Sequence, residues 1–459
     1  MNGFAQNLFA GSRFAVMGLG RNGLPAAQAL VAMGADVVAW DDAGGERDER
    51  SVSTRNLADG EFDFDALILS PGIPHRLPAP HPVAARAIAA RVPILSDAEL
   101  LFQAVRRSGS RARFVGITGT NGKSTTTALL AHILTCAGRL VAAGGNLGPA
   151  ALGLPLLGDD GIYVLEMSSY MLERLVTLRF DVAAMLNLSA DHLDRHGDMA
   201  GYTAAKRAVF DRQTAGDLAV VGVDDDGSRD LADWVRTRPA RVVTISGSPL
   251  AIAGEVNNNS GVLRDLGGPL IDMAEAPALP GAHNAQNAAA AAAMAMALGV
   301  SRDDVARGIA SYPGLAHRQQ RIATIDGTSF VNDSKATNAD AASRALGCYD
   351  RLIWIAGGQA KQGGIESLAP FFPRVARALL IGRDAPALAA TLAAAHVPHE
   401  IVGTLDAAVP AAHAAARRAG APVVLLSPAC ASFDQFSGFD ARGDRFVALV
   451  HALAAAKAA

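Results

Sequence analysis

The sequence predicts an α/β protein of three domains, and three observations lead to that expectation. Half of the 459 residues are hydrophobic, and a chain of this length corresponds to about three domains of ordinary size. Short apolar runs such as RFAVM, RFVGIT, IYVL and LIWIAGG alternate with longer Ala- and Leu-rich stretches. That alternation is typical of parallel α/β folds. The composition also changes twice along the chain.

The two changes of composition give the expected domain bounds. The basic stretch RRSGSRAR ends near residue 113, directly before the strand RFVGIT. In SYPGLAHR, Pro313 and Gly314 follow a helical run that ends at Ile309, and this pair interrupts a helix. We expect a Rossmann-like domain over 1–110, a P-loop ATPase-like domain with a parallel sheet over 111–313, and a second Rossmann-like domain over 314–459.

Composition and charge exclude several classes of function. Charged residues make up 19% of the chain and its formal net charge is −3, so no broad cationic field would attract nucleic acid or anionic lipid. No long uncharged apolar run and no signal-peptide pattern occurs, which favours a cytoplasmic protein without membrane insertion. Cys136, Cys348 and Cys430 are far apart, which argues against a disulfide framework or a zinc ribbon.

The segment Gly116 to Thr125, GITGTNGKST, predicts a phosphate-binding loop. An apolar strand precedes it and KSTTTALLAHILTC follows with helical spacing. Backbone N–H groups at such a turn bind phosphate, a lysine reaches the terminal phosphates, and a hydroxyl ligates Mg²⁺. The spacing departs from GxxxxGK[ST], because Gly116 lies six residues before Gly122 and Ile117 occupies the position of the first motif glycine. The residues assigned to ATP here are Gly119, Thr120, Asn121, Gly122, Lys123, Ser124 and Thr125.

A second glycine motif follows the first predicted strand. Gly18, Gly20 and Gly23 form GxGxxG, and Asp41 ends the strand ADVVAWD. This spacing fits a dinucleotide fingerprint, although the same turn and carboxylate would also suit the pyrophosphate and ribose of a UDP group. A purely structural turn is a third interpretation. The segment Ser70–Pro71–Gly72 ends another strand, where open α/β sheets bind ligands.

Polar residues at two later strand ends indicate metal chemistry. Glu166 follows the strand IYVL and would suit Mg²⁺, although a helix cap or surface charge would read the same. The segment SADHLDRH concentrates two aspartates and two histidines, among them His192. Without a cysteine ligand or an HExxH helix, nucleotide-bound metal is favoured over zinc. Lys206, in YTAAK, would on pattern alone be a solvated helix lysine.

Taken together, the motifs resemble the Mur ligase family along essentially the whole chain. The markers are GITGTNGKS, GGNLG, EMSSYML, NLSADHLDRH, YTAAK, GAHNAQN, GLAHR, NDSKATN and LLSPACASFDQF followed by RGDRF. The resemblance implies an ATP-dependent ligase that joins D-glutamate to UDP-N-acetylmuramoyl-L-alanine through an acyl phosphate. It also implies ATP and two Mg²⁺ ions, a carbamylated lysine at Lys206, a third domain that closes over the reacting groups, and a monomer.

The resemblance assigns roles to individual residues. The UDP-linked substrate would be held by Arg21, Asn22, Asp41, Asp42, Gly72, Asn146 and Ser168. Further contacts to ATP would come from Asn284, Asn287, Arg318 and Asp333. The metal ions would be held by Ser124, Glu166, His192 and Lys206. Glutamate would contact Thr337, Lys361, Ser432 and Phe439. The residues implied in catalysis are Lys123, Lys206, His192 and Lys335.

Three alternatives stay open. The first is a Mur-type ligase with L-glutamate or another acceptor, with folylpolyglutamate synthase as the remote case. The second is a nucleotide-binding dehydrogenase that uses the segment from Gly18 to Asp41. The third is a non-catalytic protein that binds ATP without releasing phosphate.

Overall fold

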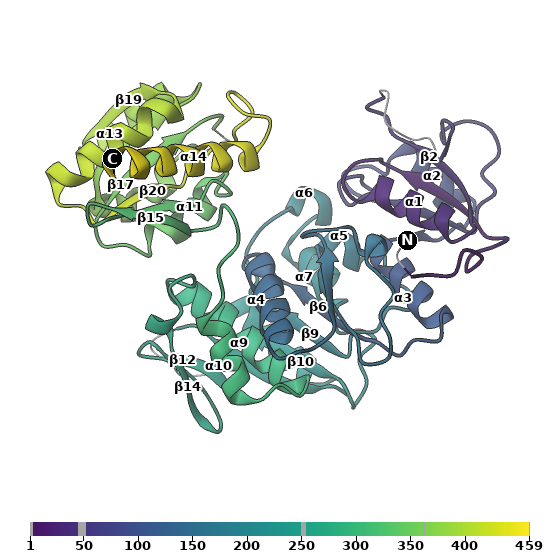
Figure 1. The fold of residues 1–459 in the computed structure, drawn as a ribbon. Coiled ribbons are helices and arrows are strands. Elements are labelled where there is room, and N and C mark those ends of the chain that lie inside the picture. The colour runs from purple at the N-terminus through teal and green to yellow at the C-terminus, as the bar shows by residue number, and fades with distance from the viewer. Residues whose placement is uncertain (1–2, 45–51, 249–253, 361–362, 459) are drawn as a thin grey trace. The chain divides into compact units, whose positions relative to one another are not determined.

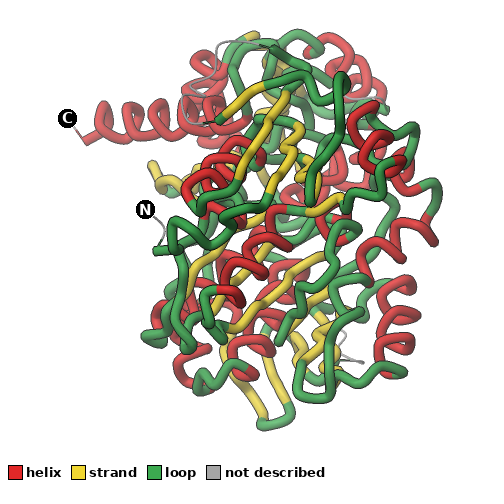
Figure 2. Tube along the Cα trace, turned by 90° about the vertical axis from the view of Figure 1, so that its right-hand side faces the viewer, coloured by secondary structure: helices red, strands yellow, loops and turns green. Residues whose placement is uncertain are grey.

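The computed structural model describes residues 3–44, 52–248, 254–360 and 363–458. The chain forms two compact units, each with its own core. Unit 1 comprises residues 1–276 and 282–312, and unit 2 comprises residues 277–281 and 313–459. Figure 2 draws helices in red and strands in yellow, and most strands have helices beside them.

Unit 1 begins with a parallel sheet of five strands. Its order is β3 (Ser53–Thr54), β2 (Asp36–Trp40), β1 (Arg13–Met17), β4 (Ala66–Leu69) and β5 (Ile94–Leu95). The helices are α1 (Gly23–Ala32), α2 (Pro82–Ala89) and α3 (Asp97–Arg107). Strands β1 and β4 are buried nearly throughout, as expected for a parallel sheet covered on both faces. The chain reverses its order beside β1, so the carboxyl ends of β1 and β4 form a crevice suited to a ligand.

A nine-stranded sheet forms the rest of unit 1. Its order is β14 (Gly268–Asp272), β13 (Val262–Asp265), β12 (Val256–Asn259), β11 (Arg241–Ser246), β10 (Leu218–Gly222), β9 (Val182–Met185), β6 (Arg113–Thr118), β8 (Ile162–Glu166) and β7 (Val141–Gly145). The strands from β7 to β12 are parallel, whereas β12, β13 and β14 form an antiparallel meander. Its helices are α4 (Lys123–Cys136), η1 (Ala151–Gly153), α5 (Ser169–Leu172), α6 (Leu193–His196), α7 (Met199–Arg207), α8 (Asp226–Arg236), η2 (Met273–Glu275), α9 (Ala282–Ala297) and α10 (Arg302–Ala310).

Helices α4 and α9 lie side by side against this sheet (Figure 1). In α9, burial runs without a break from Asn284 to Ala295, so the helix has no solvated face along that stretch. A helix that is apolar all round belongs inside a protein. The small alanine side chains let α9 approach α4 and the strands closely. The Ala-rich run is therefore an ordinary packed helix.

Unit 2 is a six-stranded sheet in a two-sided core. The order is β15 (Gln320–Ile325), β16 (Thr328–Asn332), β20 (Val423–Leu426), β17 (Leu352–Gly357), β18 (Val375–Ile381) and β19 (His399–Gly403), with only the β15–β16 pair antiparallel. Its helices are α11 (Ala339–Leu346), η3 (Glu366–Arg374), α12 (Ala385–Ala394), α13 (Leu405–Ala419) and α14 (Phe439–Ala458). Along β17, Trp354 faces one apolar cluster and its neighbours Ile353 and Ile355 face the other, because successive side chains of a strand point to opposite faces.

The three sheets confirm the predicted α/β class with mostly parallel strands. The antiparallel meander from Val256 to Asp272 was not expected, and neither was the β15–β16 hairpin. The residue bounds of the three domains stay a prediction. Among the described helices, none is long and apolar enough to cross a bilayer.

The close packing of α9 gives a test of the fold. Ala291 is fully buried, so Ala291→Leu would force extra methylenes into a filled core and lower the free energy of unfolding by about 1–3 kcal/mol. Ala297→Leu, at the exposed end of the same helix, is the matched control and should change stability little. Urea denaturation followed by circular dichroism measures both. Equal stability of the two variants would contradict the packing described here.

Candidate active site

The phosphate loop lies between β6 and α4, and its main chain is hydrogen-bonded to a residue outside the loop. Thr120 N donates to Asn187 O at 2.9 Å, and Asn121 N donates to Asn187 Oδ1 at 2.8 Å. Asn187 follows β9, the strand that pairs with β6. The loop is therefore fixed by the next strand of the sheet. Lys123 folds back over it and donates to the carbonyls of Gly119 and Thr120 at 3.0 and 2.9 Å.

Gly122 shows why the turn requires glycine before the lysine. Its φ is +84°, a left-handed conformation that costs other residues energy. A Cβ there would also overlap the side-chain oxygen of Asn287. Asn287 accepts from Thr126 Oγ1 at 3.2 Å and donates to Asn284 Oδ1 at 3.1 Å. The asparagines of α9 thus support the start of α4, which explains their place in the GAHNAQN motif.

Lys206 is buried beside the phosphate loop, with only 2% of its surface exposed. Its amine donates to Gly119 O at 2.7 Å and to Thr118 Oγ1 at 3.4 Å, and it lies 4.8 Å from the centre of the Tyr202 ring. Burial and the nearby charge of Lys123 hold the pKa of Lys206 well below its usual value. The solvated lysine that the pattern alone suggests is therefore wrong.

Glu166 ends β8 and is also buried, at 2% exposure. Asn146 Nδ2 donates to Glu166 Oε1 at 2.6 Å, whereas Oε2 has no hydrogen-bond partner among the described residues. A buried carboxylate oxygen without a partner is costly, and a hard cation would satisfy it. Ser124, on the first turn of α4, is buried as well. The donor set therefore fits Mg²⁺.

The segment after β9 divides into an exposed and a buried half. His192 adopts a left-handed conformation with φ of +53° and is exposed, 3.4 Å from Asp191. His196 is buried, with Nε2 2.9 Å from Ser169 Oγ and Nδ1 3.3 Å from Glu173. Burial lowers the pKa of His196 to about 4. No group of three His, Cys, Asp or Glu side chains that could hold a metal ion occurs in the described part of the chain.

A cavity of about 290 Å³ joins these groups, and we call it the reaction cavity. It lies where the carboxyl ends of β6, β8 and β9 meet. Its lining residues are Pro71, Gly72, Lys123, Asn146, Ser168, Ser169, Tyr170, Asp191, His192, Tyr202 and Lys206. Two lysines, a histidine, four hydroxyl-bearing residues and Asp191 thus line one space, and the two lysines suit an anionic ligand.

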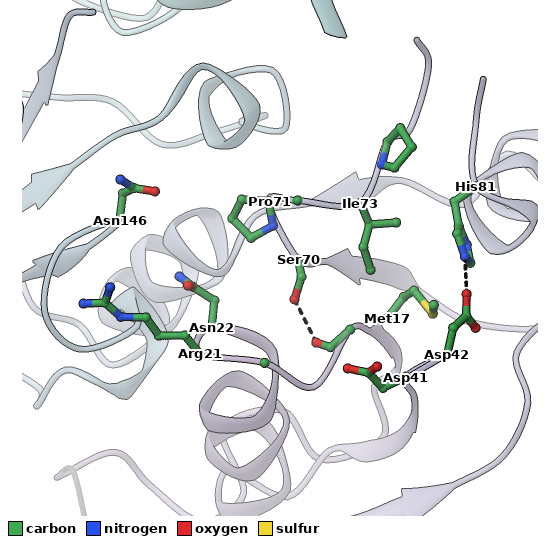
Figure 3. Close-up of a pocket in the computed structure, with 14 residues that line it drawn as sticks. Met17, Arg21, Asn22, Asp41, Asp42, Ser70, Pro71, Ile73, His81 and Asn146 are labelled. Atoms are coloured by element: carbon green, nitrogen blue, oxygen red, sulfur yellow. Dashed lines mark hydrogen bonds and ion pairs between the residues drawn. The ribbon is translucent and has the colours of Figure 1, made fainter. Parts of the chain in front are cut away.

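A second cavity, of about 540 Å³, lies at the crevice of the first sheet, and we call it the nucleotide cavity. Figure 3 shows Arg21, Asn22 and Asn146 at one end and Asp42 with His81 at the other. Asp41 accepts from the backbone N–H of Leu19 at 2.6 Å, and His81 Nε2 lies 2.7 Å from Asp42. A Cβ on Gly23 would overlap the carbonyl of Gly18, so the turn is tight. Pro71, Gly72 and Asn146 line both cavities.

Unit 2 gathers a separate polar cluster at the ends of β16 and β20. Asp333 is buried and accepts from Ser427 Oγ at 2.7 Å and from the backbone N–H of Gln319 at 3.2 Å. Burial raises its pKa to about 7. Lys335 lies 3.7 Å from the centre of the Phe439 ring. Arg318 is close enough to lower the pKa of Asp333 somewhat.

Arg442 organises this cluster, and sequence reasoning did not assign it a role. It is 1% exposed, donates to Ser334 Oγ and Ser334 O at 2.9 Å, and also donates to Cys430 O at 3.1 Å. It thereby ties NDSKATN to SPACASF. Its place in RGDRF, directly after those motifs, was the available signal.

The residues of unit 2 that are expected to bind the substrate glutamate are only partly described. Ser432 is buried, and its hydroxyl has no hydrogen-bond partner among the described residues. Thr337 follows Lys335 in the same loop. Lys361 lies outside the described residues. Unit 1 thus brings together Lys123, Lys206, His192, Asn146 and Ser168, and unit 2 brings together Asp333, Lys335 and Phe439.

Comparison with known proteins places these features in one family. Residues 117–295 match the Mur ligase middle domain and residues 317–430 the Mur ligase glutamate ligase domain. A UDP-N-acetylmuramoylalanine--D-glutamate ligase of Paramagnetospirillum magneticum is 51% identical over 97% of both chains. One from Caulobacter vibrioides is 45% identical over 97% of both. The solved UDP-N-acetylmuramate-alanine ligase of Thermotoga maritima covers 96% of this chain and all of its own, with a TM-score of 0.60 and 17% identity, which shows the shared fold.

The buried His196 gives a pH-dependent prediction. Its folded pKa of about 4 lies below the ordinary value of 6.5, so the unfolded chain binds a proton that the folded chain does not between those values. Wild type should therefore lose stability relative to His196→Gln as the pH falls from 6.5 to about 4. The Tm of both proteins across this range measures the difference. His451→Gln, at an exposed histidine, is the control. If the difference in Tm between wild type and His451→Gln changed with pH in the same way, the assignment to His196 would be contradicted.

Proposed function

The chain belongs to the Mur ligase family, and from that premise we propose that it joins D-glutamate to UDP-N-acetylmuramoyl-L-alanine while consuming ATP. The products are a new peptide bond, ADP and phosphate. The observation that carries the proposal is the reaction cavity, in which Lys123 of the phosphate loop and the buried Lys206 face the same space. Relatives that carry this name are similar along nearly the whole chain.

The proposed chemistry begins with attack of the alanine carboxylate on the γ-phosphoryl group of ATP. Both groups are anionic, so cationic and hydrogen-bonding groups must offset their repulsion and align them. Lys123 is placed to exchange its loop carbonyls for phosphate oxygens. The backbone of Gly119 to Gly122 and the start of α4 would bind the remaining oxygens. The resulting acyl phosphate would then accept the amine of glutamate.

Mg²⁺ would be held by Ser124 and Glu166, where an unpartnered carboxylate oxygen is buried. When bound there, the ion would neutralise phosphate charge. We also propose a second metal position at His192 and Lys206. Asn146 orients the Glu166 carboxylate through its hydrogen bond, so it supports the metal ligand as well as lining the cavity.

The second metal position requires a chemical change at Lys206. A lysine amine is a poor metal ligand while it is protonated, but burial favours the neutral amine and the pKa of Lys206 is lowered accordingly. A neutral amine can attack CO₂, forming a nitrogen–carbon bond and releasing a proton. The carbamate so formed supplies anionic oxygens in place of a cation. We propose that Lys206 carries this modification.

The nucleotide cavity suits the UDP portion of the substrate. The turn from Gly18 to Gly23 and the start of α1 would bind the diphosphate, and Asp41 and Asp42 offer acceptors for uracil or ribose hydroxyls. Arg21 and Asn22 line the same space, whereas Asn146 and Ser168 face the reaction cavity. The shared residues Pro71 and Gly72 would lie beside the substrate between its two ends.

Unit 2 would hold the incoming glutamate. Ser432 offers a buried hydroxyl, and Thr337, Lys361 and Phe439 complete the set that the family resemblance implies. Arg318 and Asp333 would contact ATP, and Lys335 would lie beside the transferring phosphoryl group. A cytoplasmic location and a monomeric state belong to the same proposal.

Phosphate release tests the proposal directly. We expect ATP hydrolysis that depends on UDP-N-acetylmuramoyl-L-alanine and on D-glutamate, with little stimulation by L-glutamate. Lys123→Ala should lower the rate by about 100- to 1000-fold, the scale of losing one stabilising donor in a preorganised site. Stimulation by L-glutamate instead would favour a related ligase, and phosphate release without either acceptor would contradict the assignment. A reduced-cofactor absorbance change without ATP would favour a dehydrogenase.

The modification of Lys206 has its own test. Lys206→Ala should lower the rate by about 100-fold or more, and short carboxylic acids such as acetate should restore part of it by supplying the missing anionic oxygens. Wild type with the same acids, and Lys206→Ala with matched chloride, are the controls. Intact mass measured at neutral pH should show the added CO₂. Normal activity of Lys206→Ala would remove this residue from the site.

A further inference from the structure

The segment from Ser70 to Ile73 occupies a special place between the two cavities. It supplies four residues to the nucleotide cavity, and two of them, Pro71 and Gly72, also line the reaction cavity. A substrate that spans both cavities must pass along this segment. Within its own domain, the segment is tied by Ser70, whose Oγ donates to Gly18 O at 2.8 Å and whose N donates to Met17 O at 3.0 Å. A further hydrogen bond, from Ile73 N to Ser70 O at 3.0 Å, lies within the segment.

Arg174, which follows the short helix α5 beside the nine-stranded sheet, hydrogen-bonds to the main chain of this segment. Its guanidinium donates to Leu69 O at 2.6 Å, to Ser70 O at 3.2 Å and to Ile73 O at 2.7 Å. It also lies 3.4 Å from His75 Nδ1. The arginine is 2% exposed. Buried, charge-assisted hydrogen bonds to several carbonyls from one rigid group fix their relative positions.

The arginine is itself held in place. Its backbone carbonyl accepts from Ser96 N at 3.2 Å, and the next residues, 176–178, donate three backbone N–H groups to the buried carboxylate of Glu99. Ser96 and Glu99 belong to the start of α3. The support therefore runs from α3 through residues 174–178 to the Ser70–Ile73 segment. A second arm is Arg195, which donates to Gly72 O at 2.9 Å.

We propose that Arg174 is a positioning residue, which fixes the Ser70–Ile73 segment and thereby sets the path of the uridine-linked substrate into the reaction cavity. Arg174 lines neither cavity, so it acts through the segment and not by contact with substrate. The inference rests on the proposed function, because it concerns the substrate assigned there. It predicts an effect on the UDP-linked substrate that spares ATP and D-glutamate.

The test compares Arg174→Met with Arg302→Met in the full chain. Arg302 also bridges two elements through main-chain carbonyls, those of Gly268 and Pro269, but it lines neither cavity. We expect Arg174→Met to raise the KM for UDP-N-acetylmuramoyl-L-alanine about 10- to 100-fold, since small misplacements in a site carry losses of this size. The KM for ATP and for D-glutamate should stay within about twofold. Arg174→Lys keeps the charge but loses the forked guanidinium, so its KM for UDP-N-acetylmuramoyl-L-alanine should fall between those of wild type and Arg174→Met.

Several outcomes separate this inference from its premise. If wild type shows no release of phosphate that depends on D-glutamate, the proposed function fails. If wild type is active and Arg174→Met lowers only the Tm, with all three KM values unchanged, Arg174 is merely structural and the inference is overturned. Binding of UDP by calorimetry adds a readout apart from turnover. An equal rise of KM for all substrates, or the same pattern in Arg302→Met, would also overturn the inference.

Discussion

The site of unit 1 depends on the pairing of three parallel strands, β9, β6 and β8. Parallel pairing places their carboxyl ends at one edge, with Ile117 beside Glu166 and Thr118 beside Met185. The residues that follow each strand therefore meet although they are far apart in the sequence. Asn187 fixes the phosphate loop from one side, and Glu166 approaches from the other. A register shift of one residue would turn these side chains to the opposite face.

Burial at that edge gives the groups their chemical character. Burial holds the pKa of Lys206 well below its usual value, and the nearby charge of Lys123 lowers it further. Glu166 is buried with one oxygen unpartnered among the described residues. This edge of the sheet thus contains a lysine biased towards its neutral form and a carboxylate with one oxygen unpartnered among the described residues. Both features are costly for stability, as is common at functional sites, and they are the features on which the proposed cation site and the proposed carbamate rest.

Much of the fold and the site could be predicted from the sequence, because the deciding signals are local. The strand–turn–helix around Gly122 and the GxGxxG turn are encoded within a few residues each. The burial of Lys206 could not be predicted from YTAAK, since it depends on how α7 packs over the end of β6. The role of Arg442 depends on contacts with Ser334 and Cys430, which are distant in sequence. The antiparallel meander could not be predicted, because its sequence lacks a strong alternation of apolar and polar residues and is rich in polar residues.

Two buried arginines perform the same physical task in the two units. Arg174 gathers the carbonyls of a loop in unit 1, and Arg442 gathers those of Ser334 and Cys430 in unit 2. Burial lowers the pKa of each to about 10, yet both stay charged at neutral pH. Loops carry main-chain carbonyls that apolar packing cannot satisfy, and a planar guanidinium can satisfy several of them at once. Each arginine thus fixes a loop at a strand end, where ligands bind, without occupying the space that a ligand needs.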